Sequence, residues 1–406
     1  MTDQGAFLTG VRVLDLTTFL SGPHATQILS DLGADVVKVE SRAADSSRSI
    51  PPYFVDGDSV YFHSTNRTKR SIQLDLKTEA GRRTFQALAA SVDVVIDNFR
   101  PGVMERLGAD HESLRSQNAR MITCSISGFG DGNQWSDRPA YDAIVQALSG
   151  GMSLTGHKGG PPARMGIPIG DLGAGVYAAL AISAALYRRD RHGVGEHIEI
   201  SMLDCQVALL SYQAAYYLHS GVEPGRQGSG HVSIPTYRSF ECADGEYIIV
   251  TANTDDMWRS LCRAIGREDL VEDPRFATSA QRLMNRESLS VELESAFSRL
   301  TMKQALELTI GEGVPAAPVN TVGAALSQDV VRSREMVVTL KGSDGHSVSV
   351  PGNPIKTAGD GVRPSEAMRF PPRAGQDTDA VLAELLGLSQ DEIAALRAEG
   401  AAGPFI

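Results

Sequence analysis

Short runs rich in β-branched residues alternate with helical patterns over roughly the first half of the chain, and this alternation constrains the fold more than any other feature. The runs expected to form strands are residues 11–16, 35–40, 71–76, 92–96, 120–125 and 197–201. Helical patterns lie between them at 21–30, 78–90, 103–107 and 141–148. Strands separated by helices pair in parallel, because each connection crosses a face of the sheet. We therefore predict an α/β fold with a Rossmann-like large domain.

The composition changes after two further helical patterns, at 172–189 and 202–218. Glycine and proline are dense in residues 221–230, which is typical of a linker or a mobile loop. Beyond it, the segments 247–251, 257–265, 281–300 and 302–311 read as one strand and three helices, which indicates a smaller α+β domain. We expect domains at 1–220 and 236–325, joined by a glycine-rich linker at 221–235. A tail, 326–406, follows, and Thr378 and Ser389 are predicted to cap its two helices.

The length and composition exclude several classes of protein. A chain of 406 residues exceeds the size at which a single core stops growing, so two domains are expected. The net charge of -11 disfavours nucleic acid and anionic membranes as partners. Four cysteines without a CxxC pair fit a reducing compartment, and residues 1–10 show no secretory signal pattern. The apolar segment 172–187 is shorter than the about 20 residues of a membrane span, so we expect a cytoplasmic protein.

Common cofactor and metal motifs are missing. No GxGxxG follows a predicted strand, and the P-loop-like segment 151–158 has His157 where the lysine belongs. There is no HExxH and no GxSxG, and the nine histidines do not cluster at ligand spacings. We therefore predict no metal site and no permanently bound cofactor.

Asp171 follows a proline- and glycine-rich stretch and opens a helical pattern that contains Gly173 and Gly175. From the residues alone, an ordinary N-cap is the favoured interpretation, because aspartate is among the preferred caps. The alternative is a nucleophilic carboxylate, since a helix N-terminus favours the ionised form and small neighbours leave room for a bulky substrate.

Basic residues are dense in the first half of the chain, and many follow predicted strands, where ligands of open α/β sheets bind. They are Arg42, Arg48, Arg67, Lys69, Arg70, Lys77, Arg100 and Arg106. Solvated surface charge is the default for any one of them. The segment Asn98-Phe99-Arg100-Pro101-Gly102 also follows a strand. It places an amide, an aromatic ring and a guanidinium together, where an adenine nucleotide can bind. The alternative is a plain turn without a function.

Together these motifs resemble one family, the class III CoA-transferases, which includes formyl-CoA transferase, carnitine CoA-transferase and the α-methylacyl-CoA racemases. The resemblance spans nearly the whole chain. It rests on Leu-Asp-Leu at 14–16 with Gly-Pro at 22–23, Leu-Gly-Ala-Asp-Val-Val-Lys-Val-Glu at 32–40, Lys-Arg-Ser-Ile at 69–72, Leu-Asp-Leu-Lys at 74–77, Asn-Phe-Arg-Pro-Gly at 98–102, Tyr-Asp at 141–142, Gly-Asp at 170–171 and the segment 375–379. Each motif is weak alone, and the set is specific.

The resemblance implies a function for Asp171 and a set of CoA contacts. In the family's transferases the matching aspartate is the nucleophile, and it forms an aspartyl anhydride and then an aspartyl-CoA thioester. The CoA-binding residues implied by the resemblance are Leu20, Ser21, Arg42, Leu74, Asp75, Leu76, Lys77, Asn98, Phe99, Arg100, Arg106, Tyr141 and Asp142. One departure concerns Arg42, because the family's basic residue beside the second strand is displaced here.

Tyr141 separates the branches of the family. Racemases carry a histidine at the position of Tyr141, and tyrosine is too weak a base at neutral pH to replace it, so the transferase branch is favoured. Gly228, Ser229 and Gly230 resemble the mobile glycine-rich loop that shields intermediates in formyl-CoA transferase, without its unbroken glycine run. An acyl-CoA racemase and a non-catalytic CoA-binding protein remain the alternatives.

The resemblance also implies partners and assembly. Acyl-CoA and small carboxylic acids are the expected substrates, with a dicarboxylate such as succinate among them. The expected assembly is an interlocked homodimer of ring-shaped subunits, in which residues 326–406 return to the large, CoA-binding domain.

Overall fold

The computed structural model describes residues 5–405 and divides into two compact units. Unit 1 comprises Met1–Gly151, Arg164–His219 and Asp329–Ile406, and unit 2 comprises Met152–Ala163 and Ser220–Gln328. We predicted that residues 152–163 belong to the first domain. This segment joins unit 2 because it packs on the glycine-rich loop, where Gly228 N donates to Gly156 O at 3.0 Å. Of the ten N-terminal residues examined for a signal, the first four lie outside the described part.

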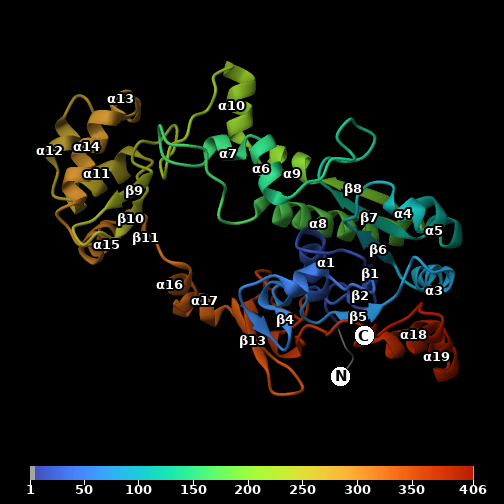
Figure 1. Ribbon diagram of the computed structural model, residues 1–406. Coiled ribbons are helices and arrows are strands. Elements are labelled where there is room, and N and C mark those ends of the chain that lie inside the picture. The colour runs from blue at the N-terminus through green and yellow to red at the C-terminus, as the bar shows by residue number, and fades with distance from the viewer. Residues whose placement is uncertain (1–4, 406) are drawn as a thin grey trace. The chain divides into compact units, whose positions relative to one another are not determined.

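Unit 1 is built on a parallel six-stranded sheet in the order β5-β2-β1-β6-β7-β8 (Figure 1). Its strands are β1 Arg12–Asp15, β2 Asp35–Glu40, β5 Arg70–Gln73, β6 Val94–Asp97, β7 Ile122–Ser127 and β8 His197–Ser201. The predicted parallel α/β sheet is therefore confirmed. The strand order reverses between β1 and β6, and a crevice forms at such a point because the connections leave to opposite faces.

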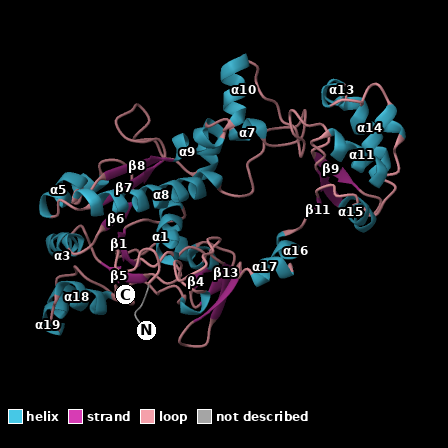
Figure 2. Cartoon of the chain, turned by 180° about the vertical axis from the view of Figure 1, so that it is seen from behind, coloured by secondary structure: helices cyan, strands magenta, loops and turns pink. Residues whose placement is uncertain are grey.

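Two apolar layers cover this sheet, because neighbouring residues of a strand point to opposite faces. On one face, Val13 packs in a cluster with residues of α1 (Ser21–Asp31) and α8 (Ile169–His192). On the other, Leu14 packs with residues of α3 (Glu79–Ala90) and α18 (Thr378–Leu386). Figures 1 and 2 show α1 beside α8, and the C-terminal helices near α3.

Helix α8 has 24 residues, so the expectation that its apolar segment is too short for a membrane is wrong. It is the one helix in residues 5–405 long and apolar enough to span a bilayer, and half of its most apolar stretch is buried. Gly175 explains its close packing, since a Cβ there would lie 2.7 Å from Ser21 O of α1. Core helices of this kind meet the same criterion, so length and composition alone are weak support for a membrane span.

Several shorter elements complete unit 1. They are η1 Ser46–Ser49, β3 Phe54–Val55, β4 Asp58–Ser59, α2 Val60–His63, α4 Val103–Arg106, α5 His111–Gln117, α6 Asp142–Leu148, α9 Met202–Leu209, α10 Tyr212–Ser220, α17 Asp329–Ser333, β12 Val337–Lys341, β13 Ser347–Pro351, η2 Ser365–Ala367 and α19 Gln390–Ala398; α7 Gly151–Leu154 begins where unit 2 starts. The helix predicted at 202–218 is two helices, because Ser211 has a left-handed φ of 52°. Ser389 caps α19 as predicted, whereas Thr378 lies inside α18, whose N-cap is Asp377.

Unit 2 contains an antiparallel sheet in the order β11-β10-β9. Its elements are β9 Arg238–Glu241, β10 Tyr247–Val250, α11 Asp255–Ala264, α12 Asp269–Glu272, α13 Ser279–Met284, α14 Arg286–Phe297, α15 Met302–Gly311, β11 Ala316–Pro318 and α16 Val322–Ser327. Phe240, Trp258 and Phe297 form its core with the other apolar residues of the sheet and helices. The helix predicted at 281–300 is broken at Asn285, whose backbone leaves the helical region.

Candidate active site

The loops after β1 and β6 are joined where the strand order reverses. Thr18 N donates to Asn98 Oδ1 at 2.9 Å, and Asn98 Nδ2 donates to Thr18 O at 2.8 Å. Phe19 N donates to Asp45 Oδ1 at 3.3 Å, and Phe19 adopts a left-handed φ of 63° that an unsupported loop would avoid. These bonds fix one wall of a cleft at the carboxyl ends of the strands.

A buried network of charges supports this wall. Lys69 Nζ lies 3.0 Å from Asp15 Oδ2, and Lys38 Nζ lies 2.9 Å from Asp45 Oδ2 and donates to Thr17 O at 2.6 Å. Burial opposes ionisation of Asp15, but the charges of Lys69 and Lys38 outweigh it and hold its pKa below the ordinary value. Burial lowers the pKa of Lys69 to about 8. These charged groups stabilise the backbone of Thr17–Phe19, which forms part of the cleft wall.

The cleft has a volume of about 490 Å³ and contains Asp171. Six of the predicted site residues line it together, namely Ser21, Asn98, Phe99, Arg100, Tyr141 and Asp171. They come from α1, the loop after β6, the N-cap of α6 and the start of α8. The Tyr141 ring packs edge-on against Phe19, with 6.3 Å between the ring centres.

Asp171 is the third residue of α8, whose N-cap is Pro168, so the interpretation of Asp171 as an N-cap is wrong. Within residues 5–405, no group donates a hydrogen bond to its carboxylate. Burial and the charge of Asp142 raise its pKa to about 7. Its carboxylate is thus half-buried, open to the cleft and unpartnered, which is the condition of a reactive group rather than of a structural one.

Asp142 holds the start of α8 from behind the cleft. Its Oδ1 accepts from Gly170 N at 2.8 Å and its Oδ2 accepts from Gln146 Nε2 at 2.8 Å. Arg164 lies 3.6 Å from Oδ2. A Cβ on Gly170 would lie 3.0 Å from Asp142 Oδ1, so glycine allows this close approach. Asp142 therefore orients the turn that carries Asp171, and it does not line the cleft itself.

Two residues of the cleft were not predicted from the sequence. Tyr61, on the four-residue helix α2, lines the cleft, and burial with the charge of Asp171 raises its pKa to about 12. Arg138 lines it from the loop before α6, and its guanidinium lies 4.9 Å from the centre of the Trp135 ring. Only the spatial proximity of α2 and α8 identifies Tyr61, because its neighbours in sequence form no motif.

The other predicted CoA-binding residues do not line this cleft. Arg42 lies 3.7 Å from Asp75, and its guanidinium is 4.2 Å from the centre of the Phe405 ring. Arg42 and Asp75 therefore lie where β5 ends beside the C-terminal segment, together with Leu74, Leu76 and Lys77. Leu20 lines an apolar groove next to the cleft. Arg106 lies on α4, close to Gly102.

Four of the basic residues in the first half of the chain are held in ion pairs. Arg48 binds Glu40 and Asp58, Arg67 binds Asp31, Lys69 binds Asp15, and Arg70 binds Asp35 and Glu384. Their charges stabilise unit 1, and Arg48, Arg67 and Lys69 are buried, so the default interpretation of these three as solvated surface charges is wrong.

The predicted loop residues Gly228, Ser229 and Gly230 belong to unit 2. Ser229 Oγ accepts from Ser239 N at 3.0 Å, and Gly230 N donates to Gln227 O at 2.9 Å. Gly228 has a φ of 62° that favours glycine. The loop is thus anchored to β9 and to the segment around Gly156.

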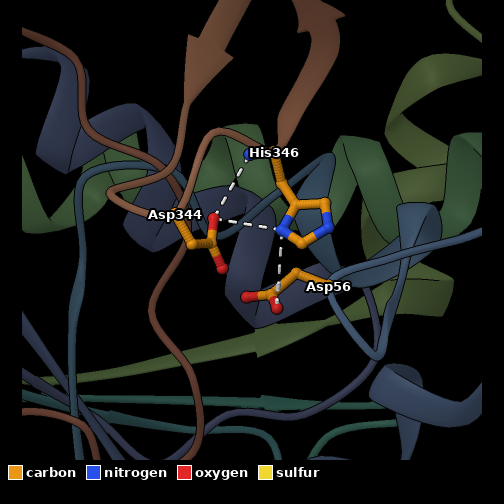
Figure 3. A group of neighbouring side chains, drawn as sticks. All are labelled: Asp56, Asp344 and His346. Atoms are coloured by element: carbon orange, nitrogen blue, oxygen red, sulfur yellow. Dashed lines mark hydrogen bonds and ion pairs between the residues drawn. The ribbon is translucent and has the colours of Figure 1, made fainter.

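One group of side chains has the composition of a metal site. Asp56, Asp344 and His346 place ligand atoms within 4.8 Å of one another (Figure 3). Arg373 donates to Asp56 at 2.7 and 2.8 Å and to Asp344 at 2.8 Å. Because this guanidinium already compensates both carboxylates, the group acts as an ion-pair clamp between the β3–β4 and β12–β13 turns.

Comparisons with known proteins identify the family of this chain. The family model described as CoA-transferase family III matches residues 8–378. The succinyl-CoA:mesaconate CoA-transferase of Haloarcula hispanica is 40% identical over 359 residues, 86% of this chain and 89% of that protein. The succinate–glutarate CoA-transferase of Agrobacterium fabrum is 38% identical over 93% of this chain and 95% of its own. A crystal structure of a CAIB/BAIF family protein from Brucella suis is 36% identical, covers 94% of this chain and 100% of its own, and gives a TM-score of 0.84. The chain belongs to CoA-transferase family III and is a CoA-transferase enzyme.

Proposed function

We propose that this enzyme moves CoA from one carboxylic acid to another through covalent intermediates on Asp171. The observation that carries the proposal is a half-buried carboxylate in a cleft to which, in residues 5–405, no group donates a hydrogen bond. A desolvated carboxylate without donors keeps its electron pairs available, so it attacks an acyl carbon more readily than a capped one. Near pH 7, its pKa leaves a large share of the group ionised.

The reaction proceeds in four balanced steps. Asp171 attacks the carbonyl of the donor thioester, which forms an aspartyl anhydride and releases CoA thiolate. The thiolate attacks the aspartyl carbonyl, which gives the aspartyl-CoA thioester and frees the donor acid as a carboxylate. The acceptor carboxylate then displaces CoA to form a second anhydride, and the thiolate attacks its acyl carbon to release the new acyl-CoA and Asp171. Water takes no part, so the energy of the thioester is conserved.

Dicarboxylic acids are the proposed substrates, with succinate as one of them. Succinate, mesaconate and glutarate, which appear in the names of the two similar transferases, each carry a second carboxylate. The cleft contains two guanidinium groups, Arg100 and Arg138, that suit a distal carboxylate or a CoA phosphate. The overall charge of -11 makes such a local positive contribution necessary for anionic ligands.

CoA is proposed to bind over the reversal point of the sheet. Ser21, Asn98–Arg100 and Tyr141 face the pantetheine arm in the cleft, with Asp142 behind it. Leu20, Arg42, Leu74–Lys77 and Arg106 remain proposed contacts of the CoA nucleotide, and Gly228–Gly230 remains the proposed shield of the intermediates. The four cysteines are free thiols, which suits the proposed cytoplasmic location.

Intact mass analysis tests the covalent role of Asp171. The protein is incubated with succinyl-CoA, and hydroxylamine is added to trap activated carboxyl groups. We expect an adduct that peptide mapping assigns to Asp171 and that is missing from Asp171→Asn. An adduct in Asp171→Asn, or full activity of that variant, would overturn the scheme. A racemase, the remaining alternative, would instead exchange the α-proton of an acyl-CoA with solvent deuterium without an acceptor acid.

A homodimer is the proposed assembly, and its interlocking rests on family resemblance alone. Helix α8 exposes Val176, Leu180 and Tyr187, of which Leu180 is 63% exposed. An apolar groove of about 760 Å³ runs between α1, α8 and residues 351–355. Exposed apolar side chains gathered beside an apolar groove are typical of subunit contacts. Light scattering should give twice the mass of one chain, and a monomer at micromolar concentration would exclude the dimer.

A further inference from the structure

Gln206 carries a buried donor that the proposed reaction does not yet use. It lies on α9 and its side chain is 4% exposed. Its Oε1 accepts from Ser149 Oγ at 3.3 Å, while its Nε2 has no partner among residues 5–405. An unpaired amide in the interior is costly, because it has lost its water and gained no acceptor. Such a group in a folded protein requires an explanation.

The unpaired nitrogen faces the start of the helix that carries Asp171. A Cβ built on Gly170 would lie 3.4 Å from Gln206 Nε2 and 3.0 Å from Asp142 Oδ1. The two atoms therefore surround the same empty position, which Gly170 leaves open. Asp142 Oδ1 accepts one hydrogen bond, from Gly170 N, and a carboxylate oxygen can accept a second.

We propose that Gln206 is a positioning residue for the reaction, which donates from Nε2 to Asp142 Oδ1 when the enzyme turns over and so limits the repulsion between Asp142 and Asp171. The inference rests on the proposed role of Asp171. Ser149 holds the Oε1 end of the amide, and the bond forms when Nε2 turns toward the position that Gly170 leaves open. An amide dipole directed at Asp142 weakens the negative field that reaches Asp171, and a larger share of Asp171 is then ionised at neutral pH.

Other charged groups surround this pair, and they stay constant when Gln206 is changed. Asp142 also contacts Gln146 of its own helix, Gly170 N of α8 and Arg164 of the loop before α8, so its charge keeps three favourable contacts without Gln206. Asp171 faces Tyr61 of α2 and shares the cleft with Arg100 and Arg138. A change in the pKa of Asp171 on substitution of Gln206 therefore comes from Gln206, because the other neighbouring charges stay the same.

The test is the pH dependence of the rate at which Asp171 is acylated by succinyl-CoA, measured in single turnovers by quenched mass analysis. Gln206→Met keeps the length of the side chain and removes the donor. Gln206→Glu keeps the oxygen that Ser149 binds and replaces the donor by an acceptor. Ser149→Ala is the matched control, since it removes the Ser149 hydrogen bond and keeps the donor.

We expect the midpoint of the acylation profile to rise by about one pH unit in Gln206→Met, with the rate at high pH unchanged. In Gln206→Glu the midpoint should rise further, and in Ser149→Ala it should stay at the wild-type pH even if the protein melts earlier. An unchanged midpoint in Gln206→Met, or an equal rise in Ser149→Ala, would overturn the inference while Asp171 is still acylated. If the wild-type enzyme forms no adduct at Asp171, the proposed function itself fails.

Discussion

Two aspartates of unit 1 show how the surroundings of a carboxylate decide its use. Asp15, at the end of β1, is fully buried, accepts from the hydroxyls of Thr17 and Thr26, and pairs with Lys69 at 3.0 Å. Asp171, at the start of α8, receives no hydrogen bond from residues 5–405 and lies near the charge of Asp142. The pKa is held low in the first and raised to about 7 in the second. A saturated carboxylate stabilises the fold, and an unsaturated one remains available for chemistry.

We expect the largest effect from Asp171→Asn, which should remove activity without lowering stability. Asp171→Asn keeps the shape of the side chain and removes the nucleophile, so CoA exchange should fall by at least about a thousandfold. Stability should not fall, because no hydrogen bond to the carboxylate is lost. CoA exchange between succinyl-CoA and a second acid measures the first effect, and thermal unfolding measures the second. Loss of activity through unfolding would contradict this assignment.

The same substitution at Asp15 should act on the fold. Asp15→Asn leaves Lys69 buried beside a neutral group, and breaking a buried pair in this way costs about 3–5 kcal/mol. The free energy of unfolding in urea measures the loss. Asp269→Asn serves as the control, because its ion pair with Arg267 is at the surface, where solvent screens it and its contribution to stability is small. Equal losses of unfolding free energy in Asp15→Asn and Asp269→Asn would contradict the structural role of Asp15.

The two carboxylates should also respond to pH in opposite directions. The pKa of Asp171 rises from 3.8 to about 7 on folding, so its contribution to stability is complete below pH 3.8 and is lost as the pH rises to 7. Asparagine does not titrate, and Asp171→Asn should therefore gain on the order of 2 kcal/mol over wild type across this window, after allowance for solvent in the cleft. The contribution of Asp15 is instead present above its ordinary pKa and is lost in acid. Urea unfolding at a series of pH values measures both, and a constant difference for Asp171→Asn would show that its pKa is not raised.

Periodicity was enough to predict the sheet, because each strand of a parallel α/β sheet is a short run rich in β-branched residues that can be recognised without knowledge of its tertiary contacts. The observed β2, Asp35–Glu40, and β8, His197–Ser201, have the predicted bounds, and β1 is one residue shorter at each end than predicted. The breaks at Ser211 and Asn285 were not predicted, since serine and asparagine also occur within ordinary helices and no local sequence pattern marks either break. The ranges of the domains and the family's CoA contacts remain predictions.

The site was predictable to the extent that its residues lie in sequence motifs. Asp171, Asn98 and Tyr141 stand in motifs and meet in one cleft. Arg48 and Lys69 were misjudged, because a sequence shows a charge but not the carboxylate that folding brings to it. Tyr61 was not predicted, because its role depends on the charge of Asp171, which is more than a hundred positions away in the sequence. No local sequence pattern shows that the two residues meet in the fold.

Tyr61 offers the smallest and sharpest test of the comparison. Its pKa of about 12 keeps the hydroxyl protonated at every working pH, so it is a permanent donor beside the one carboxylate of the cleft that lacks donors. Tyr61→Phe should slow the acylation of Asp171 about fivefold without moving the pH midpoint, because the hydroxyl can donate one neutral hydrogen bond to the acyl oxygen as negative charge develops there. Tyr53→Phe, at a ring that is 72% exposed, is the matched control and should react at the wild-type rate. If Tyr61→Phe moved the midpoint as well, the hydroxyl would already be bonded to Asp171 in the resting enzyme, and Asp171 would resemble Asp15 more closely than the structure indicates.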